Sequence, residues 1–418
     1  MAYHLQRDRS QDIKSKAVKE KDESIQKSSE VTPARRRTRF AKKLRERRGE
    51  GGFDLLLLLI IVALSLFGSV MIASASYANA AVRYGDAYYF IKRQALWLFC
   101  GLLVMLLAAR IPPSVYERYT RHAFLLTVLL LVLVLFIGQS GGGAQRWIGI
   151  GALTFQPSEL AKTTLVMMLS RHLAGKRELL ASERSGARRF WIGTLIPLLY
   201  IGLICGLVAL EKHLSCLIIL GVLGILVMLV GGSSLRGLGL FGALGGAGVA
   251  ALALFTDYTK RRILIWQNPA AFPLDGGWQT LQGMMAIGSG GFFGLGLGAS
   301  RLKYSYVAEP QNDFIFTIAC EELGFLGALL ILSLFALFIY RGYTVAMRHP
   351  HPFCALLAFG IVTKVCIQVL LNVAVVTNSI PNTGISLPFF SYGGSSLVML
   401  FAEMGILLSI SRSSHILP

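Results

Sequence analysis

Charged residues are scarce in this chain. Only 15% of its 418 residues are Asp, Glu, Lys or Arg, whereas 54% are hydrophobic. This composition excludes an ordinary soluble globular protein, because soluble domains carry about 25% charged residues. We therefore expect a polytopic membrane protein built around one helical bundle.

Several familiar catalytic patterns are missing. The sequence contains no GxxxxGK[ST] phosphate loop, no HExxH metal motif and no GxSxG nucleophile elbow. Its six cysteines form no CxxC pair and lie in or beside apolar segments, so we expect buried thiols without a disulfide framework. The glycines between 288 and 298 follow no βαβ pattern, which favours a tight turn or an anion-binding nest over a dinucleotide fingerprint.

Long apolar segments recur along the chain, and about 20 apolar residues suffice to cross a membrane. Ten segments fit this length: 53–76, 94–110, 122–139, 157–173, 191–209, 214–231, 237–256, 313–340, 354–376 and 393–411. The predicted fold class is thus all-α, with ten transmembrane helices. The membrane domain covers 53–411, and a short end follows at 412–418.

Positive charge is concentrated before the first span. Residues 1–52 hold 16 Lys or Arg against 8 Asp or Glu and show no apolar period, so we expect a disordered basic tail. Beside a membrane span, such a tail favours an orientation signal and contact with anionic lipid over nucleic-acid binding. With both termini in the cytoplasm, 29 of the 41 Lys and Arg fall on that side and ten outside. We therefore expect both termini to be cytoplasmic.

The longest connection, 257–312, is predicted to lie outside the membrane between the seventh and eighth spans. Five of the ten outer positive charges lie there, including Lys260, Arg261 and Arg262. Positive charge outside opposes the insertion bias, so this loop favours binding of an anionic ligand, with headgroup contact as the alternative. The segment "WQTLQGMMAIGSGGFFGLGLG" predicts a short amphipathic helix followed by a Gly-rich turn.

Three acids occur in the stretch "AEPQNDFIFTIACEELG", residues 308–324, at the start of the eighth span. Asp313 has two interpretations, a helix cap or a general base at the outer membrane surface. Glu321 and Glu322 lie about 12 Å deeper. For these two we expect an internal ion pair, and Lys364 is the predicted partner.

Two further polar clusters lie in predicted spans. Glu159 and Lys162 are spaced i and i+3, so they are expected to pair on one helix face. Lys364, Gln368 and Asn372 recur at i, i+4 and i+8 and form one polar stripe. Contacts between helices and a role in chemistry are both open for this stripe.

Two connections also carry charge. Arg146 and Trp147 precede the fourth span, and they are either an interfacial anchor or a contact for an anion or a sugar. His213 lies in the short turn "LEKHLSC", where we expect a solvated side chain.

Four segments together resemble a known family. "GAQRWIGIGALTFQPSELAK", "QTLQGMMAIGSGGFFGLGLGAS", "EPQNDFIFTIACEELGFLG" and "PNTGISLPFFSYGGSSL" are similar, in the same order, to signature segments of the SEDS family (shape, elongation, division and sporulation). This family comprises the FtsW/RodA/SpoVE proteins of bacterial walls. The resemblance covers about 53–411 and is closest to the FtsW and SpoVE branch.

The resemblance implies a ten-helix peptidoglycan glycosyltransferase that polymerises lipid II outside the cytoplasmic membrane. The family's essential aspartate maps to Asp313, and its "RW" motif maps to Arg146 and Trp147. The full set of candidate substrate-binding residues is Arg146, Trp147, Lys260, Arg261, Arg262, Gln279, Gln282 and Ser391. A divalent cation, Mg²⁺ or Mn²⁺, is an open cofactor, and the implied partner is a class B penicillin-binding transpeptidase.

One departure from the family stands out. Many members have "QPDLGT" between spans five and six, where this chain has "EKHLSC" from Glu211 to Cys216. The role of those family positions is therefore open in this chain.

Two rival functions remain on sequence alone. A lipid II flippase would need the deep charges Glu321, Glu322 and Lys364, because intramembrane charges mark transport pathways. A non-catalytic scaffold of the wall-synthesis complex would leave Asp313 as a helix cap. The surface carboxylate beside a basic outer loop favours chemistry on a pyrophosphate.

Overall fold

A computed structural model describes residues 52–141, 144–150, 153–178, 190–255, 257–273, 276–304 and 310–413. The predicted basic tail, apart from its last residue, lies outside the described residues. So does most of the predicted end at 412–418.

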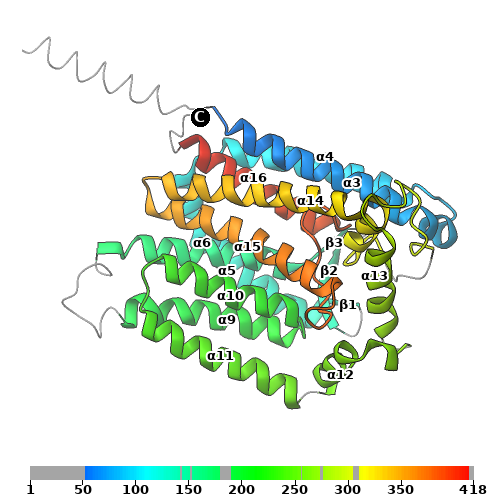
Figure 1. The fold of residues 1–418 in the computed structure, drawn as a ribbon. Coiled ribbons are helices and arrows are strands. Elements are labelled where there is room, and N and C mark those ends of the chain that lie inside the picture. Colours follow the sequence, from blue (N-terminus) through cyan, green and yellow to red (C-terminus); the bar gives the residue numbers. More distant parts are fainter. Residues whose placement is uncertain are drawn as a thin grey trace, which may run out of the picture. The chain divides into compact units, whose positions relative to one another are not determined.

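Each of the ten predicted spans coincides with a helix (Figure 1). These are α3 (Leu55–Tyr84), α4 (Tyr89–Arg110), α5 (Pro113–Ile137), α6 (Pro157–Ala174), the π-helical turn η1 (Trp191–Leu195) continued by α9 (Ile196–Leu210), α10 (Leu214–Val230), α11 (Leu235–Phe255), α14 (Ile315–Arg348), α15 (Pro352–Val376) and α16 (Gly394–Ser413). Seven are long and apolar enough to cross a membrane, counting η1 with α9, and α10 is a shorter apolar helix. The all-α, multi-pass membrane fold is confirmed, and the count of ten spans stays a prediction.

Local sequence explains several helix boundaries. Asp54 caps α3, because its Oδ1 accepts a hydrogen bond from the Leu57 N–H at 3.0 Å. Gly85 ends the same helix in the left-handed region, with φ 67°. Pro113, Pro157 and Pro352 open α5, α6 and α15, where a missing N–H costs nothing.

Helices that are distant in the sequence form the centre of the bundle. Helix α16 packs along α4, and α15 packs against both α14 and α6 (Figure 1). In each of α15 and α16, 67% of the residues in an apolar stretch of 18 are buried, whereas only 22% are buried in the corresponding stretch of α14. Helix α14 therefore presents much apolar surface outward, as expected of a helix in contact with lipid tails.

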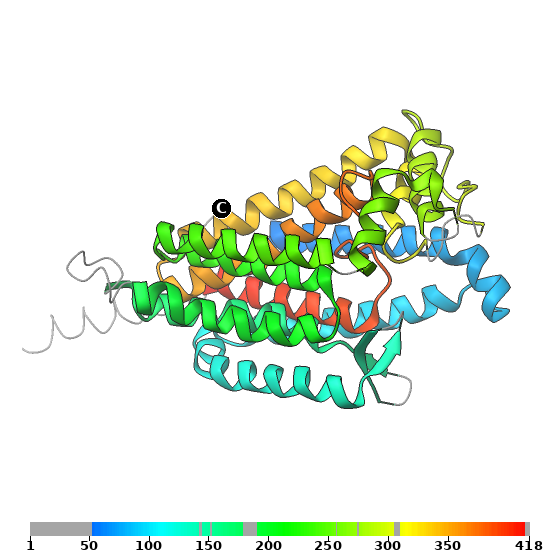
Figure 2. The ribbon, with the colours of Figure 1, turned by 90° about the horizontal axis from the view of Figure 1, so that it is seen from below.

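A small antiparallel sheet joins α5 to α6, and sequence analysis expected a loop there. Its strands are β1 (Gln139–Gly141), β2 (Ala144–Ile150) and β3 (Leu153–Phe155), in the order β1-β2-β3. Two of the strands have only three residues, which is too short for an alternating pattern to be recognised. The sheet lies at the same end of the bundle as α12 (Asp257–Gln267) and α13 (Gly277–Ser289) (Figures 1 and 2).

The long loop between α11 and α14 contains α12, the 3₁₀ turn η2 (Pro269–Ala271), α13 and a Gly-rich turn, so the predicted short helix and turn are confirmed. The turn packs against α14, where Gly324 breaks the helix with φ 66° and ψ −164°. The backbone N–H groups of Leu295 and Gly296 donate to the carbonyl oxygens of Glu321 and Glu322 at 3.0 and 2.9 Å. A Cβ on Gly290 would lie 2.0 Å from the Cys320 oxygen, so only glycine fits there. Of the two interpretations, these contacts favour the tight turn.

Candidate active site

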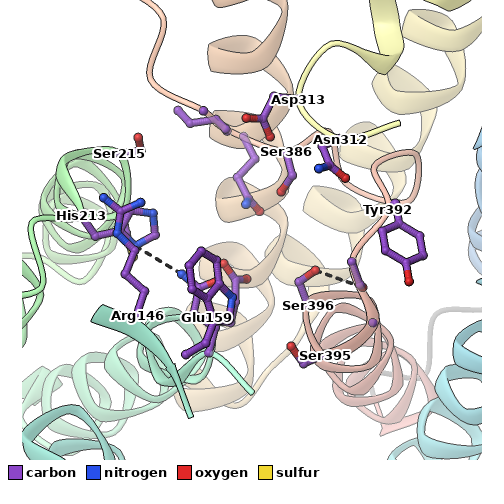
Figure 3. Close-up of a pocket in the computed structure, with 18 of the residues that line it drawn as sticks. Arg146, Glu159, His213, Ser215, Asn312, Asp313, Ser386, Tyr392, Ser395 and Ser396 are labelled. Carbon is purple, nitrogen blue, oxygen red and sulfur yellow. Dashed lines mark hydrogen bonds between the residues drawn. The ribbon is translucent and has the colours of Figure 1, made fainter. Parts of the chain in front are cut away.

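A cavity of about 590 Å³ lies at the end of the bundle that carries the sheet and α12. Figure 3 shows side chains from distant segments arranged around it. The lining residues are Arg93, Trp97, Arg146, Trp147, Thr154, Gln156, Glu159, Lys162, His213, Ser215, Cys216, Ile219, Arg262, Asn312, Asp313, Gln368, Thr383, Gly384, Ile385, Ser386, Tyr392, Gly393, Gly394, Ser395 and Ser396. Concave sites that combine several charged and aromatic groups are the usual location of chemistry.

Asp313 lies in the cavity wall immediately before α14. The residue at the helix N-cap is Phe314, and α14 has no side-chain capping bond among the described residues, so the interpretation of Asp313 as a cap is wrong. The half-buried carboxyl instead faces the cavity (Figure 3). Burial raises the pKa of Asp313 to about 6, against the opposing effect of Arg262. A carboxylate with such a pKa suits a general base near neutral pH.

The backbone around Asp313 is held by residues from α15 and the segment before α16. Asn372 Nδ2 donates to the Asp313 carbonyl oxygen at 2.8 Å. Ser391 Oγ donates to the Asn312 oxygen at 2.8 Å and accepts from the Leu387 N–H at 2.7 Å. These bonds fix the main chain and leave the carboxylate directed at the cavity. The substrate-binding role predicted for Ser391 stays a prediction.

Two arginines face the cavity from opposite sides of the fold. Arg146 on β2 donates from Nη2 to the Lys212 oxygen at 2.7 Å, and Arg262 on α12 donates from Nη1 to the Asn382 oxygen at 2.6 Å. A backbone carbonyl thus orients each guanidinium. A guanidinium has five N–H donors and a fixed positive charge, so it suits an anionic ligand in the cavity.

The other candidate substrate-binding residues of the long loop lie outside the cavity lining. Lys260 and Arg261 are exposed, and Gln282 is buried on α13 beside Gln279. These four are not among the described residues that line the cavity, whereas Trp147 is. The structure therefore brings Asp313, Arg146, Trp147 and Arg262 together. Substrate binding by the other four stays a prediction.

The acids and lysines within the helices form separate pairs. Glu159 and Lys162 pair as expected, with 2.7 Å between Oε1 and Nζ, and both line the cavity. Lys364 pairs with Glu403 of α16 at 2.5 Å, so the prediction that Lys364 pairs with Glu321 or Glu322 is wrong. Sequence analysis missed Glu403, although a lone acid within an apolar span was the available signal.

Glu321 and Glu322 contact the Gly-rich loop and α3. The Ser300 hydroxyl donates to Glu321 Oε2 at 2.5 Å. Lys303 Nζ lies 3.0 Å from Glu322 Oε1, and the Ser74 hydroxyl donates to the same carboxylate at 2.6 Å. Both acids are buried, and their contacts join the loop to the broken part of α14.

The turn between α9 and α10 forms another wall of the cavity, which sequence analysis did not expect. The His213 ring nitrogen Nδ1 lies 3.4 Å from Gln156 Nε2 and 3.5 Å from Ser158 Oγ. Burial lowers the pKa of His213 to about 4, and Arg146 and Lys162 act in the same direction, so the ring is neutral at pH 7. Burial raises the pKa of Glu211 to about 8, against the effect of Arg146. The turn "EKHLSC" therefore contributes a neutral imidazole, Ser215 and Cys216 to the cavity wall.

Sequence analysis also missed the wall formed by Arg93, Trp97 and Tyr392. Arg93 and Trp97 begin α4, and Tyr392 lies in the motif "FFSYGG". The spacing i, i+4 of the first two residues on one helix face was the available signal.

Comparisons with known proteins agree on one family. The sequence profile of the FtsW/RodA/SpoVE family, described as "Cell cycle protein", matches residues 54–416. The chain is 37% identical to stage V sporulation protein E of Bacillus subtilis over 365 residues, which cover 87% of this chain and 98% of that protein. It is also 37% identical to a probable peptidoglycan glycosyltransferase FtsW of Geobacter sulfurreducens over 362 residues, with coverage of 86% and 95%.

Solved structures have the same fold. A chain from a structure described as "Structural coordination of polymerization and crosslinking by a peptidoglycan synthase complex" is similar with a TM-score of 0.70 at 27% identity, covering 86% of this chain and 98% of that chain. The rod shape determining protein RodA of Thermus thermophilus is similar with a TM-score of 0.64 at 27% identity, with coverage of 87% and 97%.

Proposed function

The chain belongs to the FtsW/RodA/SpoVE family, and from this premise we propose that it is a peptidoglycan glycosyltransferase with Asp313 as its general base. The substrate is lipid II, a disaccharide-peptide on a polyprenyl pyrophosphate, and the product is a glycan strand. The single observation that carries this proposal is the half-buried Asp313 carboxyl facing a cavity that also contains Arg146 and Arg262.

The proposed reaction is one displacement at an anomeric carbon. Asp313 accepts the proton of an acceptor sugar hydroxyl, whose oxygen bonds to the anomeric carbon of the donor. The bond between that carbon and the pyrophosphate oxygen breaks, so the anomeric configuration inverts. The leaving group is an anion, and Arg146 and Arg262 stabilise it by charge-assisted hydrogen bonds.

The deep charges support the polymerase proposal over a lipid II flippase. Lys364 is paired with Glu403 and Lys303 with Glu322, and these side chains are almost wholly buried. Charges used in a transport pathway face a wet cavity. The pair Lys303–Glu322 instead joins a loop to α14, whereas Lys364, which joins α15 to α16, also lines a small cavity of about 30 Å³.

A divalent cation would have to arrive with the substrate, because the described part of the protein offers few ligands for one. Among the described residues, no group of three or more His, Cys, Asp or Glu side chains is placed to hold a metal ion. The cavity's two acids are Asp313 and Glu159, and Glu159 is paired with Lys162. These residues do not form a metal centre of their own. We propose that Mg²⁺ or Mn²⁺ enters bound to the substrate's pyrophosphate.

We further propose a membrane orientation with both termini cytoplasmic and the cavity on the outer face. The arrangement of positive charge along the sequence supports this orientation. The proposed partner is a class B penicillin-binding transpeptidase. It is supported by the likeness to a chain from a peptidoglycan synthase complex.

The first test is polymerisation of labelled lipid II by the purified chain with its transpeptidase partner and Mg²⁺, with the glycan products separated on a gel. We expect a ladder from the natural protein and none from Asp313→Ala, because removing a general base costs about 100-fold or more in rate. Glu178→Ala is the matched control, since Glu178 is an exposed acid outside the cavity lining.

Two outcomes would contradict the proposal. A ladder from Asp313→Ala equal to that of the natural protein would remove Asp313 from the mechanism. No ladder from either protein, with the complex intact, would instead favour a flippase or a scaffold.

A further inference from the structure

A row of aromatic side chains leads from the cavity to the tip of the α3–α4 hairpin. Tyr84 stacks on Tyr89 with 3.9 Å between ring centroids, Tyr89 meets Phe90 edge-on at 5.3 Å, and Phe90 meets Tyr392 edge-on at 5.0 Å. We call Tyr84, Tyr89, Phe90 and Tyr392 the aromatic strip. It is continuous, because each ring contacts the next.

The strip begins inside the cavity wall. Tyr392 lines the cavity together with Arg93 and Trp97 (Figure 3). The Arg93 guanidinium carbon lies 4.4 Å from the centroid of the Tyr89 ring, within cation–π distance. The Tyr392 N–H donates to the Gln311 oxygen at 2.9 Å, two residues before Asp313. The strip is thus joined to the segment that carries the proposed base.

The outer end of the strip lies at the end of a helix that is longer than the hydrocarbon core of a bilayer. Helix α3 has 30 residues, so it is about 45 Å long, whereas the hydrocarbon core of a bilayer is about 30 Å thick. Asp54 at the opposite end pairs with Arg341, which places the last turns of α3 outside the hydrocarbon. Tyr84 is 48% exposed, and Tyr88, in the same hairpin, is 57% exposed. Tyrosines also gather at membrane interfaces, and a helix of this length matches the thickness of about 40–45 Å of a bilayer with its headgroups, so the exposed Tyr84 is also placed to act as an interfacial anchor.

Both walls of the cavity carry an arginine, and the wall with Arg93 is the one that continues into the aromatic strip. Arg146 lies on one side of Asp313 and Tyr392 on the other (Figure 3). A pyrophosphate fits the side with Arg146. A sugar fits the aromatic side, because its C–H faces pack on aromatic rings while Arg93 N–H and tyrosine O–H groups bond to its hydroxyls.

Resting on the proposed function, we propose that the aromatic strip is a binding track for the saccharide strand. The strand leaves the cavity past Tyr392 and Arg93 and follows the hairpin to Tyr84. A polymer made in this cavity has to leave it, and the strip is continuous with the cavity wall and exposed at its outer end. Exposed aromatic patches of this kind are typical of binding surfaces.

The test measures binding of a dye-labelled, lipid-free peptidoglycan oligosaccharide to the full-length protein in nanodiscs by fluorescence anisotropy. We expect Tyr84→Ala to weaken binding by about tenfold and Tyr84→Phe to leave it within about twofold, because the ring supplies the contact. Tyr119→Ala is the matched control, since Tyr119 is an exposed tyrosine near an arginine, in the first turns of α5 at the other end of the bundle. Tyr89→Ala is the second variant, in case Tyr84→Ala does not fold, because Tyr89 stacks on Tyr84 in the strip.

The outcomes separate this proposal from the proposed function. Tyr119→Ala is expected to bind the oligosaccharide as the natural protein does, whereas Asp313→Asn is expected to make no glycan. Equal binding by the natural protein, Tyr84→Ala and Tyr89→Ala would overturn the track even if polymerisation is intact. If Tyr84→Ala lost binding of the transpeptidase partner but kept binding of the oligosaccharide, the strip would be a protein contact. That result would also overturn the proposal. Failure of the natural protein to polymerise lipid II concerns the proposed function alone.

Discussion

At the scale of single residues, three acids that are close in the sequence have different environments. Asp313 faces the cavity, where burial raises its pKa to about 6. Glu321 and Glu322 contact the Gly-rich loop through Ser300 and Lys303. Glu321 follows Asp313 by eight residues, a spacing that would place the two on one face of a continuous helix. The helix begins after Asp313, so that face is not shared.

The pKa of Asp313 predicts the direction of the pH dependence. A general base acts in its ionised form, so the polymerisation rate should fall as pH decreases through about 6. At one unit below this pKa, the rate should be about tenfold below its plateau. The measurement is the initial rate of glycan formation between pH 5 and about pH 8.

His213 provides a control for this profile. Its pKa of about 4 lies below the tested range, so His213→Gln should leave the inflection near pH 6 in place. An inflection that disappears in His213→Gln would assign the titration to the imidazole and contradict the prediction for Asp313.

At the scale of elements, the broken helix α14 depends on the loop packed against it. Gly324 breaks the helix, and N–H groups of the Gly-rich turn satisfy the carbonyl oxygens of Glu321 and Glu322. The pair Lys303–Glu322 then holds the loop to α14, with side chains 4% and 0% exposed. A helix break that loses its hydrogen-bond partners is costly inside a membrane protein.

Breaking this buried pair should destabilise the protein without touching the cavity. Lys303→Met leaves the Glu322 carboxylate buried without its counter-charge, and we expect a loss of about 3 kcal/mol in unfolding free energy. Ser74 still donates to Glu322, which keeps the loss at the lower end of the usual range. The measurement is thermal unfolding of the purified protein in detergent.

Lys92→Met is the matched control. Lys92 pairs with Asp86 at 2.8 Å, but their side chains are 67% and 39% exposed, and exposed pairs contribute little. Equal melting temperatures for Lys303→Met and the natural protein would show that the buried pair does not hold the loop.

At the scale of the whole molecule, distant segments meet to form one cavity. The wall combines the first turns of α4, the strand β2, the turn after α9 and the segment before α16. Packing of α16 along α4 and of α15 on α6 brings these segments to one end of the bundle (Figure 2). The site is thus a property of the complete membrane domain.

The proposed orientation is testable at this scale. We expect alkaline phosphatase fused after Pro273, in the long loop, to be active outside the cytoplasm. The same enzyme fused after Lys176 should be inactive, and a fluorescent protein at the C-terminus should fluoresce. The opposite pattern of activities would reverse the orientation. The readout is enzyme activity per unit of fusion protein in intact cells.

The sequence by itself determined the membrane class, the helix positions and the identity of the proposed base. Apolar runs of about 20 residues are local signals, and helices satisfy their own hydrogen bonds within one segment. The motif around Asp313 likewise lies within a few residues, so a resemblance could identify it. The Glu159–Lys162 pair was predictable for the same reason, because i and i+3 positions share a helix face.

Only the tertiary structure decided which distant residues meet. The pairing of Lys364 with Glu403, rather than with Glu321 or Glu322, depends on the packing of α15 against α16. The places of His213 and Tyr392 in the cavity likewise depend on the turn after α9 and on the contact between α16 and α4. Such contacts join positions far apart in the chain. They are selected by the summed packing of whole helices, which no single segment of the sequence encodes.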